Sequence, residues 1–155
     1  YDALALVGWI LSTAALGAST GIFFAPGPWY DALQKPAFNP PNWIFGPVWT
    51  ALYVSMGVAL WLVRREQNAT PVLRSRATRW FVAQFLLNLL WTPLFFGLRS
   101  PFLAVVDIAL LWLALVATIL AFRRVRPLAA WLLLPYLAWV SFAAILNGSI
   151  WRLNL

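Results

Sequence analysis

The apolar residues of this chain gather into five long stretches, separated by short polar segments. The stretches cover about residues 3–24, 44–63, 80–98, 102–122 and 128–150. Each is close to the roughly 20 apolar residues that an α-helix needs to cross a bilayer. The pattern therefore predicts an all-α integral membrane bundle of five transmembrane helices, in which residues 1–155 form a single domain. The very short Arg99–Pro101 connection makes the third and fourth helices antiparallel neighbours.

Prolines are expected to modify three of these helices. Pro47 falls in the first turn of the second helix, where a missing N–H group costs little. Pro93 should kink the third helix about one turn upstream, and Pro135 should bend the fifth. Residues 151–155 are expected to form a short tail after the fifth helix.

The segment at residues 25–43, between the first two helices, is expected to be an irregular loop. Pro36, Pro40 and Pro41 fix φ and remove backbone donors, which excludes a regular helix there. The sequence WYDALQ after Pro28 predicts one or two helical turns. Two interpretations of this loop stay open. Its aromatic residues could lie at the level of the lipid headgroups, or the loop could form a proline-stiffened lid over an aromatic pocket.

Small residues recur at four-residue spacing in the first helix, as Gly8-xxx-Ser12 and Gly17-xxx-Gly21. Such spacing permits the close approach of another helix. We expect this approach inside the bundle rather than at a dimer seam.

Composition agrees with a membrane protein and restricts its chemistry. Of the 155 residues, 63% are hydrophobic and 10% are charged, whereas a soluble domain carries roughly 25% charged residues. The chain has no cysteine, no histidine and four acidic residues. Disulfides, thiolate or imidazole metal sites and conventional acid–base catalysis are therefore not expected.

Basic residues are distributed unequally between the two ends of the predicted bundle. Three lie on the side of the proline-rich loop: Lys35, Arg99 and Arg152. Eight lie on the opposite side: Arg64, Arg65, Arg74, Arg76, Arg79, Arg123, Arg124 and Arg126. The positive-inside rule then places the N-terminus in the cytoplasm and, in a bacterial cell membrane, the loop in the periplasm. Topology explains the net charge of +7 better than nucleic-acid binding does.

Polar and aromatic residues form stripes on three predicted helices. The members are Trp49 and Tyr53; Gln84, Asn88, Trp91 and Phe95; and Tyr136, Trp139, Ala143 and Asn147. Turned inward, the stripes would line a cavity with stacking faces and sparse donors, as a planar, largely apolar ligand requires. Alternatively, the amides hydrogen-bond between helices and the aromatic rings fill a core without a ligand.

Asp107 is the one acidic residue clearly within a predicted helix. A carboxyl group in hydrocarbon is expensive and normally has a partner. We expect Asp107 to pair with a donor such as Tyr53, Trp91 or Asn147, or to recognise a ligand, and the structural role is favoured.

Several motifs together resemble one known family. They are WYDALQKPAFNPPNWIFGPVWTALY, then Gln84-xxx-Asn88-xx-Trp91-xxx-Phe95-Phe96, then Val106-Asp107, then PYLAW with a later Ala and Leu-Asn. In this order they resemble the tryptophan-rich sensory protein / translocator protein family from about residue 20 to 154. The resemblance implies a five-helix bundle, commonly a homodimer in the lipid membrane, that binds porphyrins such as protoporphyrin IX and benzodiazepine-site ligands beneath the first loop.

The resemblance also implies site residues. The ligand contacts would be Tyr30, Pro40, Trp49, Tyr53, Asn88, Trp91, Phe95, Trp139 and Ala143, to which we add Asp107 as a candidate. Trp49 and Trp139 match tryptophans implicated in light-dependent porphyrin breakdown in bacterial members. No metal or covalent cofactor is expected. Residues 146–152 lack the Tyr of the proposed sterol motif, a weak pattern in any case, so sterol binding there is not expected.

Three functions therefore follow as hypotheses. The first is a membrane receptor or sensor that binds porphyrins and takes part in tetrapyrrole handling. The second is an enzyme that degrades the bound porphyrin in light, and the third is a transporter of tetrapyrroles or apolar solutes. The sequence shows no internal repeat, so it gives no support to an inverted-repeat transporter.

Overall fold

The computed structural model describes residues 2–24 and 26–155, and it confirms the all-α membrane bundle. Five helical segments are long and apolar enough to cross a membrane. They are formed by α1 (Asp2–Phe23), α3 (Asn42–Arg65), α4 (Pro71–Thr92) with its π-helical continuation η1 (Pro93–Gly97), α5 (Pro101–Val125), and α6 (Pro127–Leu132) followed by α7 (Leu134–Leu153). The short α2 (Pro28–Ala32) lies between α1 and α3.

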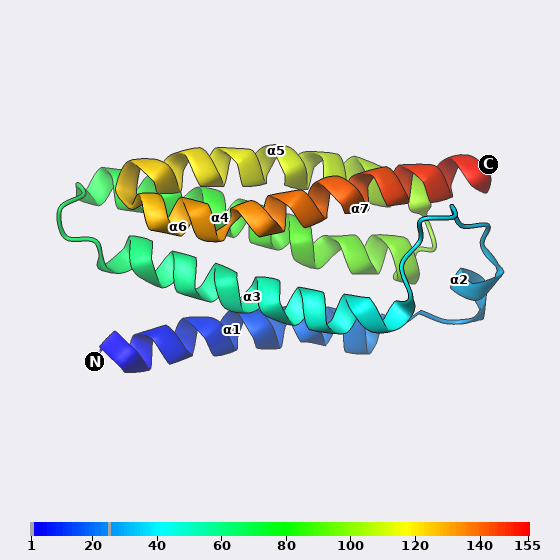
Figure 1. Cartoon of the computed structure of the whole chain (residues 1–155), viewed down its shortest axis with the longest axis horizontal. Coiled ribbons are helices and arrows are strands. Elements are labelled where there is room, and N and C mark those ends of the chain that lie inside the picture. The colour runs from blue at the N-terminus through cyan, green and yellow to red at the C-terminus, as the bar shows by residue number, and fades with distance from the viewer. Residues whose placement is uncertain (1, 25) are drawn as a thin grey trace.

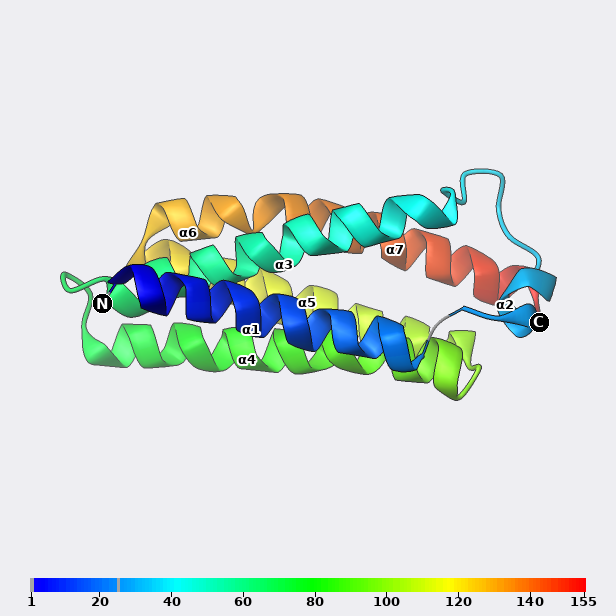
Figure 2. The same cartoon turned by 90° about the horizontal axis from the view of Figure 1, so that it is seen from below.

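The long helices run lengthwise beside one another (Figure 1). Helix α1 packs along α3, α4 packs along α5, and α5 packs against both α6 and α7. The N-terminus lies at one end of the bundle, and α2 lies with the C-terminus at the other (Figure 2). We call these the arginine end and the lid end. At the arginine end α3 packs against α6, whereas α3 and α7 diverge toward the lid end (Figure 1).

Helix α4 begins at Pro71, well before the predicted start at residue 80. The Thr70 hydroxyl accepts a hydrogen bond from the Leu73 N–H group at 3.2 Å, and proline occupies the first helical position, so the start carries two local signals. Arg74, Arg76 and Arg79 therefore belong to the helix rather than to a loop. The apolar pattern did not predict this first part of α4, because a polar or amphipathic turn lacks the continuous apolar residues by which a membrane span is recognised.

Three prolines mark the spans. Helix α3 begins at Asn42, so Pro47 lies inside the helix rather than in its first turn as predicted. In the third span the helix changes type at Pro93, and in the fifth it is interrupted just before Pro135. At Pro93 the α-helix gives way to a π-helical turn, in which the Leu98 N–H group bonds to the Pro93 carbonyl at 2.9 Å. Near Pro135 the helix is interrupted at Leu133, whose N–H group bonds to Ala130 at 3.1 Å. A wider or broken turn accommodates the missing N–H group.

The fifth span also continues to Leu153, so residues 151–153 are helical and not part of a tail. Asn154 follows as the C-cap, with its N–H group bonded to the Trp151 carbonyl at 3.3 Å. Its side chain satisfies a further carbonyl of the last turn. A polar capping residue therefore sets this end rather than the loss of apolar residues.

Glycines bring α1 and α3 unusually close. A Cβ atom at Gly57 would lie 2.7 Å from Cα of Ile10, and a Cβ atom at Gly17 would overlap the Tyr53 ring. Between these points the Thr13 hydroxyl donates to the Tyr53 carbonyl at 2.8 Å. The expected close approach thus occurs inside the bundle, but it depends on Gly57, which the sequence pattern did not single out.

The other small residues of α1 do not make close approaches. Cβ atoms at Gly8 and Gly21 would have no neighbour within 4 Å. The Ser12 hydroxyl donates to the Gly8 carbonyl of its own helix at 2.7 Å. The prediction from Gly8-xxx-Ser12 is therefore wrong, because this face of α1 is turned away from α3.

Candidate functional site

A cavity of about 440 Å³ lies at the lid end of the bundle. Residues of α1, α3, α4, η1, α5 and α7 line it, and Tyr30 of α2 reaches it from the loop. The position fits the fold, because α3 and α7 diverge toward this end (Figure 1). The volume falls in the range of small-molecule sites.

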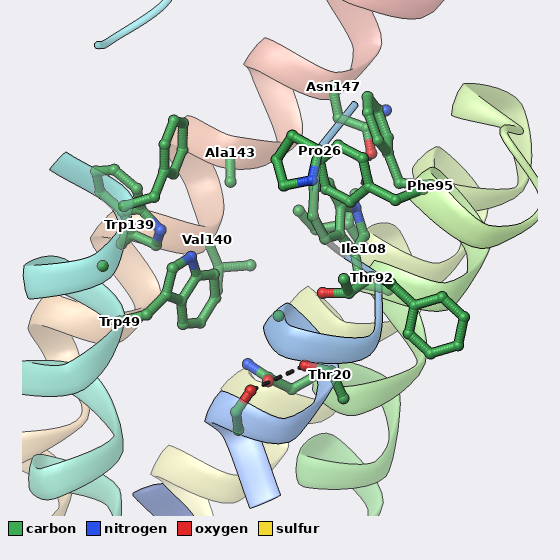
Figure 3. A pocket seen from close by; sticks show the side chains of 18 of the residues that line it. Thr20, Pro26, Trp49, Thr92, Phe95, Ile108, Trp139, Val140, Ala143 and Asn147 are labelled. Atoms are coloured by element: carbon green, nitrogen blue, oxygen red, sulfur yellow. Dashed lines mark hydrogen bonds between the residues drawn. The ribbon is translucent and has the colours of Figure 1, made fainter. Parts of the chain in front are cut away.

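Two indoles dominate one wall of the cavity. Trp49 of α3 stacks on Tyr53 with ring centroids 5.6 Å apart and an interplanar angle of 27°. Trp139 of α7 meets Phe45 edge to face at 5.9 Å, and this pair bridges the space between the two backbones. Figure 3 shows Trp49 and Trp139 on the same side of the cavity.

The facing wall comes from the π-helical end of the third span. Trp91 and Phe95 stack with centroids 5.0 Å apart, and Phe95 lies across the cavity from the two indoles (Figure 3). The Trp91 Nε1–H group donates to Asn147 Oδ1 at 2.9 Å, while Asn147 Nδ2 donates to the Pro101 carbonyl at 3.2 Å. These bonds fix the wall to α5 and α7.

A buried hydrogen-bond chain lies below the aromatic walls. The Tyr53 hydroxyl donates to Asn88 Oδ1 at 2.8 Å, and Asn88 Nδ2 donates to the Tyr136 hydroxyl at 2.7 Å. The Tyr136 hydroxyl in turn donates to Gln84 Oε1 at 2.8 Å. The chain ties α3, α4 and α7 together. Both interpretations of the stripes are therefore correct in part, since these amides join helices while the rings above them line a cavity.

The loop between α1 and α3 covers the cavity from the lid end. Tyr30 packs edge to face on Phe95 at 6.1 Å and on Phe96 at 5.4 Å. Burial raises the pKa of the Tyr30 phenol, and the neighbouring Asn39 side chain partly offsets this shift. Lys35 Nζ lies 4.5 Å from the centroid of the Tyr30 ring. This arrangement favours the interpretation of the loop as a lid.

Most of the predicted ligand residues surround this one cavity. The members that line it are Tyr30, Trp49, Tyr53, Asn88, Trp91, Phe95, Trp139 and Ala143. Pro40 and Asp107 are not among the described lining residues. Pro40 belongs to the extended part of the lid that leads into α3.

Asp107 is 3% exposed on α5, and its expected pairing is wrong. Neither carboxyl oxygen has a hydrogen-bond partner among the described residues. Tyr53, Trp91 and Asn147 all donate elsewhere. Helix α5 instead presents Ile108 and Leu111 to the cavity, so Asp107 lies beside the lining rather than in it.

The sequence patterns missed the contribution of α1. Ala14, Gly17, Ala18 and Gly21 line the cavity, and their small size leaves the space that bulkier residues would fill. The Gly17-xxx-Gly21 spacing was the available signal, but it predicted helix contact only. Phe45 and Phe96 were also missed as lining residues, because an aromatic residue in a membrane helix is by itself uninformative.

The cavity is aromatic and uncharged. None of its described lining residues is Lys, Arg, Asp or Glu, and the described residues contain no cluster of acidic, histidine or cysteine side chains that could hold a metal. Trp139 Nε1 is buried and has no hydrogen-bond partner among the described residues. The site can therefore stack a planar apolar molecule and donate a hydrogen bond to it.

These features define the class of protein: a multi-pass integral membrane protein whose helices enclose a loop-covered aromatic cavity. The chain belongs to the TspO/MBR family, whose model matches residues 5–152. The family resemblance of the sequence motifs is thereby confirmed.

Curated relatives come from bacteria, archaea and animals. The Tryptophan-rich protein TspO of Chlorobaculum tepidum is 47% identical over 86% of this chain and 86% of its own length. The protein of the same name in Archaeoglobus fulgidus is 42% identical over 97% of both chains. The human Translocator protein is 42% identical over 90% of this chain and 85% of its own length. The similarity therefore extends over nearly the whole bundle.

Proposed function

We propose that this protein binds porphyrins, such as protoporphyrin IX, in the aromatic cavity and takes part in tetrapyrrole handling as a membrane receptor or sensor. The observation that carries the proposal is the pair of facing aromatic walls, Trp49–Tyr53 and Trp91–Phe95, around an uncharged space. Facing aromatic rings suit a planar macrocycle, whose area is mostly apolar. Benzodiazepine-site ligands share this chemistry and belong to the same proposal.

The charge distribution indicates how a porphyrin would be oriented. Burying a carboxylate without a charged or hydrogen-bonded partner is strongly unfavourable, and the described cavity lining has no cation. The propionate groups would therefore point to the lid end, where Lys35 and Arg152 are located. A porphyrin dimethyl ester lacks these charges and should therefore bind more weakly than the free acid, by about 0–1 kcal/mol if the propionates stay solvent-exposed.

A titration with protoporphyrin IX, followed by tryptophan quenching in the dark, tests binding. Phenylalanine at position 49 or 139 keeps an aromatic face but removes the indole N–H group. Losing one neutral hydrogen bond costs about 0.5–1.5 kcal/mol, so Trp49→Phe and Trp139→Phe should weaken binding by at most about tenfold. Trp112→Phe is the matched control, since Trp112 bonds to Ser141 at 2.9 Å and does not line the cavity. Equal weakening by Trp112→Phe would contradict the site.

Light-dependent porphyrin degradation is the second candidate function. The observation that favours it is that both indoles line the cavity, which places two oxidisable rings beside the ligand. Illumination of the complex should then abolish the Soret band and yield a new product, and both Phe variants should lose this reaction. Simple fluorescence quenching without a new product would show that the protein binds porphyrin but does not degrade it. Porphyrin flux into vesicles would instead favour transport.

We also propose a homodimer in a bacterial cell membrane with the N-terminus in the cytoplasm. The arginines in the last turns of α3 and α5 lie at the end of the bundle that holds the N-terminus (Figure 1), and the positive-inside rule places that end in the cytoplasm. Gln67→Cys in this otherwise cysteine-free chain should be labelled from the cytoplasmic side alone. Labelling from outside intact cells would show that the orientation is the reverse of the one proposed. A monomeric mass in detergent and lipid would contradict the dimer.

A further inference from the structure

The lid is joined to the end of α7 by a reciprocal pair of hydrogen bonds. The Gln34 backbone N–H group donates to Asn154 Oδ1 at 2.9 Å, and Asn154 Nδ2 donates to the Gln34 carbonyl at 2.8 Å. One side-chain amide thus satisfies both backbone groups of a single lid residue, as a neighbouring strand would. Residues 34 and 154 are far apart in sequence, so the pair is a tertiary contact.

The same amide also completes α7. Asn154 is the C-cap of this helix, and its Nδ2 donates a second bond to the Ile150 carbonyl at 2.8 Å. Ile150 lines the cavity and belongs to the apolar cluster that contains Tyr30. The polar contact of the lid and its apolar contact therefore meet the same last turn of α7, at the roof of the cavity.

Within residues 26–40, the other hydrogen bonds of the lid stay inside the lid. Lys35 Nζ reaches the carbonyls of Leu33 and Asp31, and the Asn39 N–H group bonds to Pro36. The apolar packing of Tyr30 favours a closed lid but does not fix its register. The Asn154–Gln34 pair is the directional contact between the lid and the helices.

We propose that Asn154 is a positioning residue that latches the lid and so sets the rate at which a ligand enters and leaves the cavity. The inference rests on the proposed function in that the ligand occupies this cavity. Because both entry and exit require an open lid, weakening the latch should accelerate both steps and leave the equilibrium affinity unchanged. A residue that touches the ligand behaves differently, since its loss mainly raises the dissociation rate.

Asn154→Leu tests the latch, because leucine has a similar size but no hydrogen-bonding group. Loss of both bonds to Gln34 should raise the association and dissociation rates of protoporphyrin IX about tenfold each. Asn154→Asp keeps the acceptor for the Gln34 N–H group and loses the donor, so its rates should lie between those of the wild type and those of Asn154→Leu. Gln34→Ala is the matched control: the latch uses the backbone of Gln34, and this variant should have wild-type rates.

Amide hydrogen exchange in the ligand-free protein gives a readout independent of any ligand. The Gln34 amide should exchange faster by a similar factor in Asn154→Leu, while amides of α3 and α5 stay protected. Unchanged exchange at Gln34 would overturn the latch. Faster exchange with unchanged porphyrin rates would overturn its control of ligand access.

The two proposals fail in different ways. If the wild-type protein did not bind protoporphyrin IX, the proposed ligand would be wrong, whereas the exchange of the Gln34 amide would still decide whether Asn154 holds the lid. Should Asn154→Leu not fold, Asn154→Asp carries both measurements. A drop in affinity without a rise in the association rate would show that Asn154 supports the site only as part of α7, and would overturn the gating role.

Discussion

The two ends of this bundle are packed in opposite ways. At the arginine end, side chains from α3, α4, α5 and α6 pack against one another in the interior. Those with 0% exposure include Met56, Ala59, Val63, Ala77, Phe122 and Ala129, together with Leu133 at the end of α6. At the lid end, α1, α3, α4, η1, α5 and α7 surround a cavity of about 440 Å³. The bundle therefore has a packed core at one end and a cavity at the other.

The difference comes from helix paths rather than from a scarcity of large residues. Near the arginine end α3 packs on α6, where Ala129 and Ala130 are buried. Beyond the break at Leu133, α7 follows a separate path, and the π-helical η1 alters the end of the third span. Large aromatic residues then bridge the wider space without filling it, which shows that ring size alone does not close a cavity.

The largest effect is expected from a cavity made in the solid end. Phe122 has 0% exposure and stacks on Phe81 at 6.0 Å, so Phe122→Ala should destabilise the fold by about 3–5 kcal/mol. Thermal unfolding in detergent measures this loss. Leu120→Ala, at a position that is 55% exposed, is the control and should change stability little. Similar losses in the two variants would mean that the arginine end is not the solid part.

The boundary between the two ends is expected to respond next. Tyr53→Phe removes the donor to Asn88 Oδ1 and keeps the ring that stacks on Trp49. A buried acceptor left without a donor costs about 1–3 kcal/mol, so the unfolding midpoint should fall. Porphyrin affinity should change less than stability, because the hydroxyl points toward the buried chain. A large loss of affinity with unchanged stability would place the Tyr53 hydroxyl in the site instead.

Filling the hollow end should separate binding from stability. Ala143 lines the cavity on α7, among the rings that Figure 3 shows, and Ala143→Leu places a larger side chain in that space. Porphyrin affinity should fall at least about tenfold, or about 1.4 kcal/mol, while the unfolding midpoint is unchanged or higher. Unchanged affinity, measured by tryptophan quenching, would show that the ligand does not use this part of the cavity.

The smallest effect concerns pH at the arginine end. The Asn68 backbone N–H group, and then Arg126, hold the pKa of Glu66 below its usual value of 4.5. The pKa of Glu66 is lower in the folded protein than in the unfolded chain. Ionised Glu66 therefore stabilises the fold at pH values above the unfolded pKa, and this stabilisation is lost as the pH falls through the folded pKa. The unfolding midpoint between about pH 3 and 6 should depend less on pH in Glu66→Gln than in the wild type. An identical pH dependence in Glu66→Gln and the wild type would show that Glu66 does not contribute to the loss of stability in acid.

The sequence by itself determined the class of fold and most of the chemistry of the site. Apolar length specifies a membrane helix because each backbone group must be satisfied within its own segment in lipid. Helical periodicity then places Trp91 beside Phe95 and Trp49 beside Tyr53, and the absence of histidine and cysteine restricts the chemistry before any contact is known. These properties are local, so a single chain reveals them.

Tertiary structure alone decided where the space is and how it is closed. Among the described residues the Asp107 carboxyl lacks a hydrogen-bond partner because of the way α5 is turned. The small residues of α1 line the cavity because α3 and α7 diverge there. Asn154 is hydrogen-bonded to Gln34 because the end of α7 lies beneath the lid. Such contacts join residues distant in the chain, and the free energy that fixes them comes from packing between helices, which no local pattern encodes.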